Sequence, residues 1–425
     1  MSTVQIAALI VSLTALLAYV NARFIKLPPQ IGLLAIALTA SLVVVALDAL
    51  GLIDASHIRD VVEQANFGPT LLHGMLGFLL FAGALHIRID ELAAQKWTVL
   101  ALSLGGTLIS TVLVASAIYG VLAALGHQIS ALDALLFGAL ISPTDPIAVL
   151  GVLKRSKVPR TLAVQISGES LFNDGIGVVI CTVLLAVAAG DHVSGGDVVM
   201  LFAREAVGGA LFGLILGLIG DRLLRAIDEY TVEVLVTLAL VLGGYVAAET
   251  IHVSAPIGAV VAGIVIGNRT PRTARPHHLD LWEVIDEILN AVLFLMLGLE
   301  ATRLRVSLEV AIAAACAVPL VLGARFVSVA ASLAALRPLR VGQSHALAIL
   351  TWGGLRGGLS VALALSLPPG AARDTILLMT YAVVAFAILV QGLTLSLVLK
   401  RLGLTADGGG GADAENSWDS RAEHS

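Results

Sequence analysis

The chain has 425 residues, of which 58% are hydrophobic and only 13% are charged, and its formal net charge is −5. Soluble domains carry about 25% charged residues, so this composition excludes a soluble globular protein and indicates a polytopic membrane protein. Both cysteines, Cys181 and Cys316, lie in apolar runs, which excludes a disulfide framework and a cysteine metal site. The sequence contains no P-loop, GxGxxG or HExxH motif that would indicate a nucleotide-dependent or zinc enzyme.

The apolar runs predict about 13 membrane spans, because a bilayer core of about 30 Å requires about 20 apolar residues in a helix. The first run is apolar from the outset and lacks a basic region, which predicts a retained span and not a cleaved signal peptide. Short connections leave no room for a soluble catalytic domain. The predicted spans are 4–20, 31–50, 68–87, 97–122, 131–152, 161–190, 198–221, 231–249, 254–267, 283–300, 306–336, 343–367 and 374–399.

Lysine and arginine are concentrated in the odd-numbered connections and at the end of the last span. The positive-inside rule therefore places the N-terminus outside and the C-terminus in the cytoplasm, in a cell (inner) membrane. We divide the chain into a transmembrane domain, 1–402, and a Gly-rich polar tail, 403–425, which is expected to be disordered.

The sixth predicted span contains the polar stretch SGESLFNDGIG, residues 167–177. On a helix, Glu169 shares a face with Asn173, and Ser170 shares a face with Asp174, because each pair is four residues apart. An ionised carboxylate at membrane depth costs at least a few kcal/mol. Since folding does not require that cost, the stretch favours a functional site over the alternative that these groups only bond neighbouring helices.

The fifth predicted span is interrupted by ISPTDPIAVL, in which Pro143 and Pro146 flank Thr144 and Asp145. Proline removes a backbone donor and moves the preceding residue out of the helical region. The helix is therefore expected to unwind here, free the Thr144 carbonyl, and leave Asp145 as the N-cap of a half-helix that begins at Pro146.

The twelfth predicted span is interrupted by TWGGLRGGLS, in which four glycines surround Arg356. Glycine permits backbone conformations that open a helix, although close helix packing is an alternative reason for glycine in a membrane span. The two interrupted spans cross the membrane in opposite directions. This arrangement is the signature of a secondary transporter built from inverted repeats, with a site near the bilayer midplane.

The motifs SPTDPIAVL, GESLFNDGIG and GGLRGGLSVALALSLP together resemble those of the sodium/proton exchangers of the monovalent cation–proton antiporter superfamily. The resemblance is strongest to the electroneutral prokaryotic branch, which is related to the animal exchangers, and it covers about residues 4–400. It implies an all-α fold of 13 helices, a homodimer and an elevator-like movement. It also implies an ion-binding core around spans 4–6 and 11–13, with the remaining spans forming a scaffold.

The resemblance implies roles for five residues of the two motifs in spans 5 and 6. Asp174 matches the aspartate that carries the ion and the proton, with Asn173 beside it, and Ser170 matches a ligand hydroxyl. Thr144 and Asp145 match the unwound ligand segment. A transported Na⁺ is thus expected at Asp174, Ser170, Asp145 and Thr144.

Three further charged residues match structural positions of the family. Arg325 lies inside an apolar span and needs a buried anion. Glu169 and Arg325 match a buried ion pair, and Arg356 matches the arginine of the second broken helix, although Arg356 is an alternative partner for Glu169. Asn173 resembles the one-for-one class, since relatives with two aspartates at this place tend to be electrogenic.

These features predict a transporter, not an enzyme, that exchanges Na⁺, and also Li⁺, for H⁺ without a cofactor and without a nucleic-acid partner. K⁺/H⁺ exchange is the alternative within the family. A cation channel would use a similar acidic midplane but needs a continuous pore. An intramembrane protease uses paired aspartates, and Asp145 and Asp174 lack the GxGD-like context of such enzymes.

Overall fold

The computed structural model describes residues 2–65, 68, 74–127, 129–153, 156, 158–188, 195–269, 277–304, 307–336 and 345–404. Within these ranges the chain is helical apart from short connections, and an isolated antiparallel bridge pairs Asp145 with Leu355. The predicted all-α class is therefore confirmed. Residues 405–425 of the predicted tail and residues 69–73 of the third predicted span lie outside the described residues.

The helices of the first half begin where the sequence supplies a start signal. Ser2 and Gln5 form a capping box, in which the Gln5 N–H donates to Ser2 Oγ and the Ser2 N–H donates to Gln5 Oε1. Pro29 occupies the first turn of the second helix, where no N–H is needed. The helices are α1 (Thr3–Val20), α2 (Pro29–Ala49), α3 (Ser56–Gln64), α5 (Leu76–Leu85), α6 (Ile89–Ala94), α7 (Lys96–Leu100), α8 (Thr107–Ala124), α9 (Ala131–Ile141), α10 (Ile147–Leu153) and α11 (Arg160–Ala188).

The second half continues with helices of similar character. A 3-10 turn at Ala301–Arg303 follows the fifteenth helix, and π-helical turns at Asn21–Ile25, Ala101–Gly106 and Ala387–Gln391 extend or join neighbouring helices. The helices are α12 (Gly195–Arg225), α13 (Tyr230–Thr250), α14 (Ala255–Arg269), α15 (His277–Glu300), α16 (Leu308–Ala335), α17 (Ala346–Trp352), α18 (Gly358–Leu365), α19 (Ala371–Phe386) and α20 (Gly392–Arg401).

Many of these helices are long and apolar enough to cross a membrane, so the chain is a multi-pass membrane protein. Shorter apolar helices accompany them at Leu76–Leu85, Ala131–Ile141 and Ala255–Arg269. The count of about 13 spans stays a prediction. Eight stretches within the described residues meet the length and composition of a span: Val4–Ile25, Pro29–Ala49, Lys96–Ala124, Arg160–Ala188, Gly196–Arg225, Tyr230–Thr250, Leu308–Ala335 and Ala371–Arg401.

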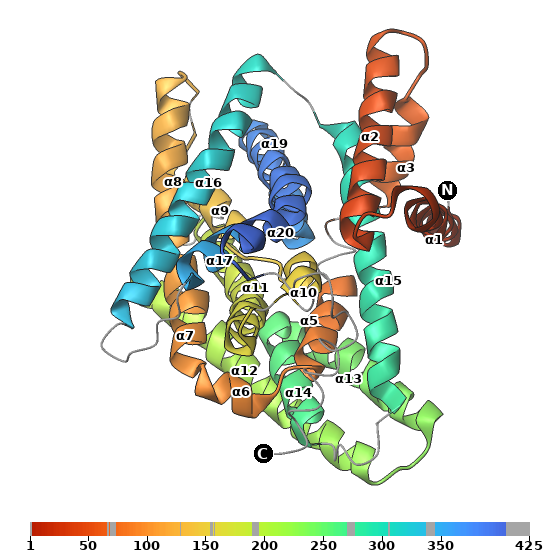
Figure 1. Ribbon diagram of the computed structural model, residues 1–425, viewed down its shortest axis with the longest axis vertical. Helices are drawn as coiled ribbons and strands as arrows, with labels where there is room; N and C mark the ends of the chain where they lie inside the picture. Colours follow the sequence, from red (N-terminus) through yellow and green to blue (C-terminus); the bar gives the residue numbers. More distant parts are fainter. Residues whose placement is uncertain are drawn as a thin grey trace.

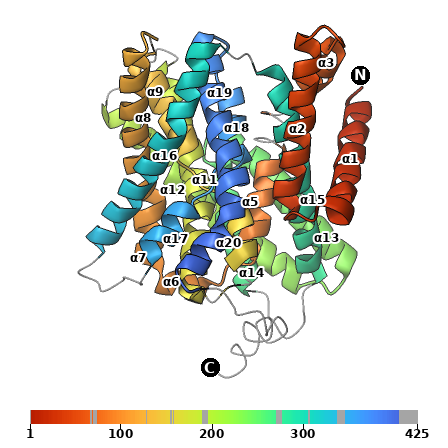
Figure 2. The same cartoon turned by 45° about the horizontal axis from the view of Figure 1, so that its top comes forward.

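The helices pack in two groups that flank α11. On one side α8 packs on α9 and α16, and α16 packs on α19. On the other side α12 packs on α14, α14 packs on α5, and α15 packs on α2. Both views show α8, α9 and α16 at one edge of the molecule, α1, α2 and α15 at the other, and α11 between them (Figure 1, Figure 2). This arrangement puts the polar stretch of α11 in the interior.

Two of the predicted spans are each divided into a pair of half-helices, at the places where the sequence contains proline or glycine. Helix α9 ends at Ile141 and α10 begins at Ile147, while α17 ends at Trp352 and α18 begins at Gly358. We refer to residues 142–146 as the first break and to residues 353–357 as the second break. The expected N-cap was wrong by one residue: the Leu150 N–H donates to the Pro146 carbonyl, so Pro146 holds the cap position of α10 that Asp145 was expected to hold.

Candidate functional site

The two breaks meet through their main chains. The Asp145 N–H donates to the Leu355 carbonyl at 2.8 Å, and the two residues form an antiparallel bridge. Unwound backbone inside a membrane protein must find hydrogen-bond partners within the protein. Each break therefore supplies part of what the other lost, and the four half-helices end at one place.

Arg356 of the second break satisfies carbonyl groups of the first. Its Nη1 donates to the carbonyls of Ser142 and Pro143, the latter at 2.9 Å. In an unbroken helix the Ser142 carbonyl would accept from residue 146, but that residue is a proline and has no N–H. The Arg356 side chain is 2% exposed, and its positive charge lies at the C-terminal, negative end of α9.

Asp145 of the first break lies against the start of α18 in the second. A methyl group added at Gly357 would stand 2.6 Å from Asp145 Oδ2, so the carboxylate is packed directly on that glycine. The N-terminal end of a helix carries a partial positive charge that favours an anion. The charged residue of each break thus stabilises the end of a half-helix that belongs to the other break.

Helix α11 fixes the first break through Asn173 and Ser170. The Thr144 N–H donates to Asn173 Oδ1 at 3.2 Å, and Asn173 Nδ2 donates back to Thr144 Oγ1 at 2.9 Å. Thr144 Oγ1 also lies 3.0 Å from Ser170 Oγ. These three residues are buried and form a clamp that holds the first break against α11.

Asp174 follows this clamp and differs from its neighbours. Its side chain is partly exposed, whereas Asn173 and Gly175 are buried. Its carboxylate accepts no hydrogen bond from the residues that the structure describes, and Asp145 is the charged group that acts on it. The carboxylates of Asp174 and Asp145 and the hydroxyls of Thr144 and Ser170 thus lie close to the first break. Such oxygen groups are ligands that suit a small hard cation.

Glu169 is held by Arg325 of α16 and not by Arg356. Arg325 Nη1 donates to Glu169 Oε1, and Nη2 donates to Glu169 Oε2 at 2.9 Å. The same guanidinium donates from Nε and Nη2 to the Leu350 carbonyl at 3.3 and 3.0 Å. Glu169 is 1% and Arg325 5% exposed, and a methyl group at Gly354 would stand 2.5 Å from Arg325 Nε. This bidentate pair ties α11 to α16 and leaves Glu169 neutralised.

Sequence reasoning did not single out Asp286 and Asn290 of α15. The Asp286 carboxyl lies within electrostatic range of Asp145 and of His86. Asn290 is 2% exposed and its Nδ2 donates to the Asp286 carbonyl. The signal that could have revealed them is their spacing of four within an otherwise apolar helix face.

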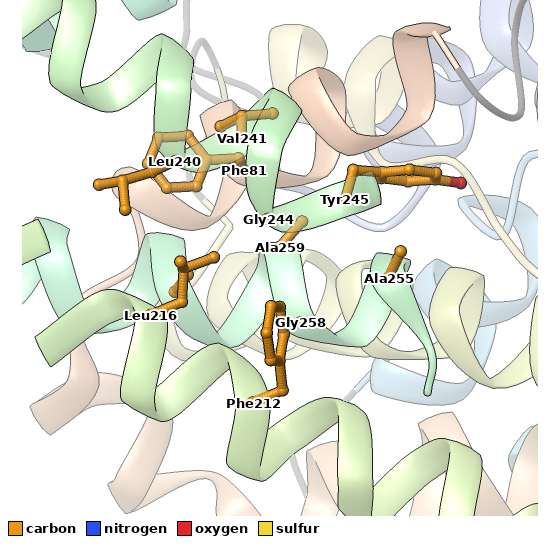
Figure 3. A pocket seen from close by; sticks show the side chains of 11 residues that line it. Phe81, Phe212, Leu216, Leu240, Val241, Gly244, Tyr245, Ala255, Gly258 and Ala259 are labelled. Carbon is orange, nitrogen blue, oxygen red and sulfur yellow. The ribbon is translucent and has the colours of Figure 1, made fainter. Parts of the chain in front are cut away.

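An apolar cavity elsewhere in the molecule is not part of this site. It lies between α5, α12, α13 and α14. Figure 3 shows its lining of Phe81, Phe212, Leu216 and Leu240, with the hydroxyl of Tyr245 at the periphery. This lining offers no carboxylate and therefore does not suit a cation.

Comparison with known proteins gives a consistent result over nearly the whole chain. The family model "Sodium/hydrogen exchanger, transmembrane" matches residues 11–401. The chain is 45% identical to the Na(+)/H(+) antiporter NhaP of Pseudomonas aeruginosa, over 94% of this chain and 96% of that protein. It is 35% identical to the Na(+)/H(+) antiporter NhaH of Halobacillus dabanensis, over 90% and 94% of the two chains.

The fold has a counterpart among solved structures. The sodium proton antiporter MjNhaP1 of Methanocaldococcus jannaschii, solved at pH 8, superposes with a TM-score of 0.71 at 21% sequence identity, over 92% of this chain and 96% of that chain. The match in fold, the family match over residues 11–401 and the 45% identity agree with the motifs described above. The chain therefore belongs to the sodium/hydrogen exchanger family of transmembrane proteins.

Proposed function

We propose that this protein is a secondary transporter that exchanges Na⁺ for H⁺ across the cell (inner) membrane, with Asp174 as the shared site. The observation that carries the proposal is the Asp174 carboxylate, which lies unpaired among the described residues beside the crossed breaks. The names of the relatives, which are Na⁺/H⁺ antiporters, support the choice of ions.

Exchange follows from competition for one carboxylate. A carboxylate inside the membrane domain must be neutralised, and either a proton or a Na⁺ ion can do this. The Na⁺ ion would take further oxygen ligands from Ser170, Thr144 and Asp145. Because the protonated and the Na⁺-bound forms carry the same charge, both can move with the site, while the empty carboxylate is retained. Access from one side at a time then couples the two fluxes.

The stoichiometry that we infer is one Na⁺ for one H⁺. Three observations on the neighbouring side chains support it. Glu169 is neutralised by Arg325 in a bidentate pair. Asp145 lies on the N-terminal end of α18. Asn173 is engaged by Thr144 through both ends of its amide. Of the carboxylates Asp145, Glu169 and Asp174, we infer that Asp174 is the one whose protonation changes, so that the cycle moves no net charge.

The larger arrangement is proposed by analogy with the family and by the packing in two groups. We infer that the helices of spans 4–6 and 11–13 form the moving core of a transmembrane domain, 1–402, and that the other spans form a scaffold which pairs in a homodimer. The arginine distribution supports an external N-terminus and a cytoplasmic tail, 403–425. Li⁺ is inferred as a second substrate, because it is also a small hard cation.

Proton movement in proteoliposomes tests the function. Vesicles with an imposed pH gradient and an internal pH dye receive Na⁺, Li⁺ or K⁺ in separate samples. We expect the gradient to dissipate with Na⁺ and Li⁺ and to persist with K⁺. Dissipation by K⁺ alone would replace Na⁺ by K⁺ as the substrate. No response to any of the three cations would contradict exchange, and a cation current without a proton gradient would indicate a channel.

A further inference from the structure

Three buried hydroxyl groups meet at the end of α9, outside the proposed ion ligands. Ser142 Oγ lies 2.7 Å from the Gly138 carbonyl oxygen and 3.0 Å from Ser110 Oγ. Thr111 Oγ1 lies 3.3 Å from the same Ser142 Oγ. Ser110 and Ser142 are each 2% exposed and Thr111 is 4% exposed, and α8 supplies two of the three residues. We call these three residues the hydroxyl cluster.

The Ser142 hydroxyl is the centre of these hydrogen bonds. A serine hydroxyl has one proton and two acceptor lone pairs. The Gly138 carbonyl can only accept, so Ser142 donates to it, in a bond from residue i to residue i−4. The same proton is shared with Ser110 Oγ, and Ser142 accepts from Thr111 Oγ1. The Ser142 hydroxyl therefore joins α9 to α8 through both residues.

The backbones of α8 and α9 approach closely at the same level. A side chain at Gly138 would collide with the Thr111 carbonyl oxygen, so glycine is required there. The close approach leaves the hydroxyl cluster no room to rearrange. Ser142 is thus held at two points: its hydroxyl is fixed by α8, and its carbonyl accepts from Arg356.

We propose that the hydroxyl cluster is a positioning network that sets the place of Thr144 and Asp145 and thereby the affinity and selectivity for the cation. Ser142 stands two residues before Thr144 and is the last residue before the prolines of the first break. Loss of its hydroxyl removes the side-chain connection between the end of α9 and α8, while the clamp from Asn173 remains. The ion ligands then keep their chemistry but lose their fixed distances. This inference rests on the proposed function.

Kinetics in proteoliposomes test the network through Ser142→Ala, Ser110→Ala and Thr111→Val. The matched control is Ser116→Ala, since Ser116 also lies on α8 and, among the described residues, its hydroxyl donates only to the Val112 carbonyl of that helix. We expect Ser142→Ala to raise the apparent KM for Na⁺ about fivefold, the effect of one net hydrogen bond, at a nearly unchanged maximal rate. The ratio of the KM values for Na⁺ and Li⁺ is expected to change. Ser110→Ala and Thr111→Val are expected to follow with smaller effects, and Ser116→Ala is expected to match the wild type.

Two outcomes would overturn the network. One is an unchanged KM and an unchanged Na⁺/Li⁺ ratio in all three cluster variants. The other is a fall in maximal rate alone, which would indicate a purely structural role.

Hydrogen–deuterium exchange separates this inference from the proposed function, because it does not depend on transport. Ser142→Ala is expected to accelerate exchange in the peptide that covers residues 142–150 and to leave α12 unchanged. If Ser142→Ala is too unstable to purify, Thr111→Val provides the same comparison. Equal rates of hydrogen–deuterium exchange in the variants and the wild type would refute the network even if the wild type transports Na⁺. A wild type that moves no protons would refute the proposed function. The hydrogen–deuterium exchange result would still show whether the hydroxyl cluster positions the first break.

Discussion

Arg356 donates a hydrogen bond to the Pro143 carbonyl at 2.9 Å, across 213 positions of the chain. The bond joins the arginine of one helix break to the carbonyl that the other break has freed. Asp145 makes the reverse connection, because its carboxylate is packed on Gly357 at the start of α18. The two breaks are therefore interdependent, and a change in one is expected to affect the geometry of the other.

The Arg356 connection predicts the effect of Arg356→Gln. Two buried carbonyls lose their donor, at a cost of about 1–3 kcal/mol for each unsatisfied group. We expect a lower thermal unfolding temperature together with a loss of Na⁺-driven proton flux. Arg204→Gln is the matched control, since Arg204 also donates to a backbone carbonyl, that of Ile251, but is exposed. Equal stability of the two variants would contradict the role of Arg356.

Gly357→Ala is predicted to impair transport by displacing Asp145. The added methyl group would stand 2.6 Å from Asp145 Oδ2, which is closer than two such atoms can approach. We expect a reduced Na⁺ affinity in proteoliposomes. Gly323→Ala serves as control, because a methyl group at that position of α16 meets no atom within 4 Å. Wild-type affinity in Gly357→Ala would show that the position of Asp145 is not important.

The pair of Glu169 and Arg325 predicts non-additive stability. Removing one partner of a buried pair strands the other charge, at a cost of about 3–5 kcal/mol. Glu169→Gln and Arg325→Gln are each expected to lower thermal stability, and the double variant is expected to recover part of the loss. A double-mutant cycle measures this coupling. Strict additivity would mean that the two residues do not stabilise each other.

The proposed stoichiometry predicts transport that does not respond to membrane potential. If Asp174 is the carboxylate that exchanges its proton for Na⁺, one H⁺ replaces one Na⁺ and no charge moves. Proteoliposomes with a K⁺/valinomycin potential of either sign are expected to show the same Na⁺ flux. A flux that follows the potential would instead implicate Asp145 or Glu169 as a second proton carrier.

The sequence carried enough information to predict where the breaks and the polar stretch lie. Proline and glycine act on the local backbone, so Pro143, Pro146 and the glycines around Arg356 marked the interruptions directly. The spacing of four residues between Glu169 and Asn173, and between Ser170 and Asp174, predicted a polar helix face within an apolar run for the same local reason.

Contacts between segments that are distant in the chain could not be predicted in this way, because they depend on how the helices pack. Both Arg325 and Arg356 were acceptable partners for Glu169, and only packing selects Arg325, which passes beside Gly354. The cap of α10 also fell one residue later than expected, since the Asp145 side chain is directed to α18 and not to its own half-helix. The hydrogen-bonding role of the Ser142 hydroxyl gave no signal, because one serine in an apolar span is common.

The dependence of the apparent KM for Na⁺ on pH, measured in proteoliposomes with Asp174→Asn in parallel, tests the shared site most directly. If Na⁺ and H⁺ compete for the Asp174 carboxylate, the apparent KM for Na⁺ rises as the pH is lowered, and Asp174→Asn, which has nearly the same shape, shows no Na⁺-driven proton movement. A KM for Na⁺ that is the same at every pH, or substantial exchange by Asp174→Asn, would contradict the proposal.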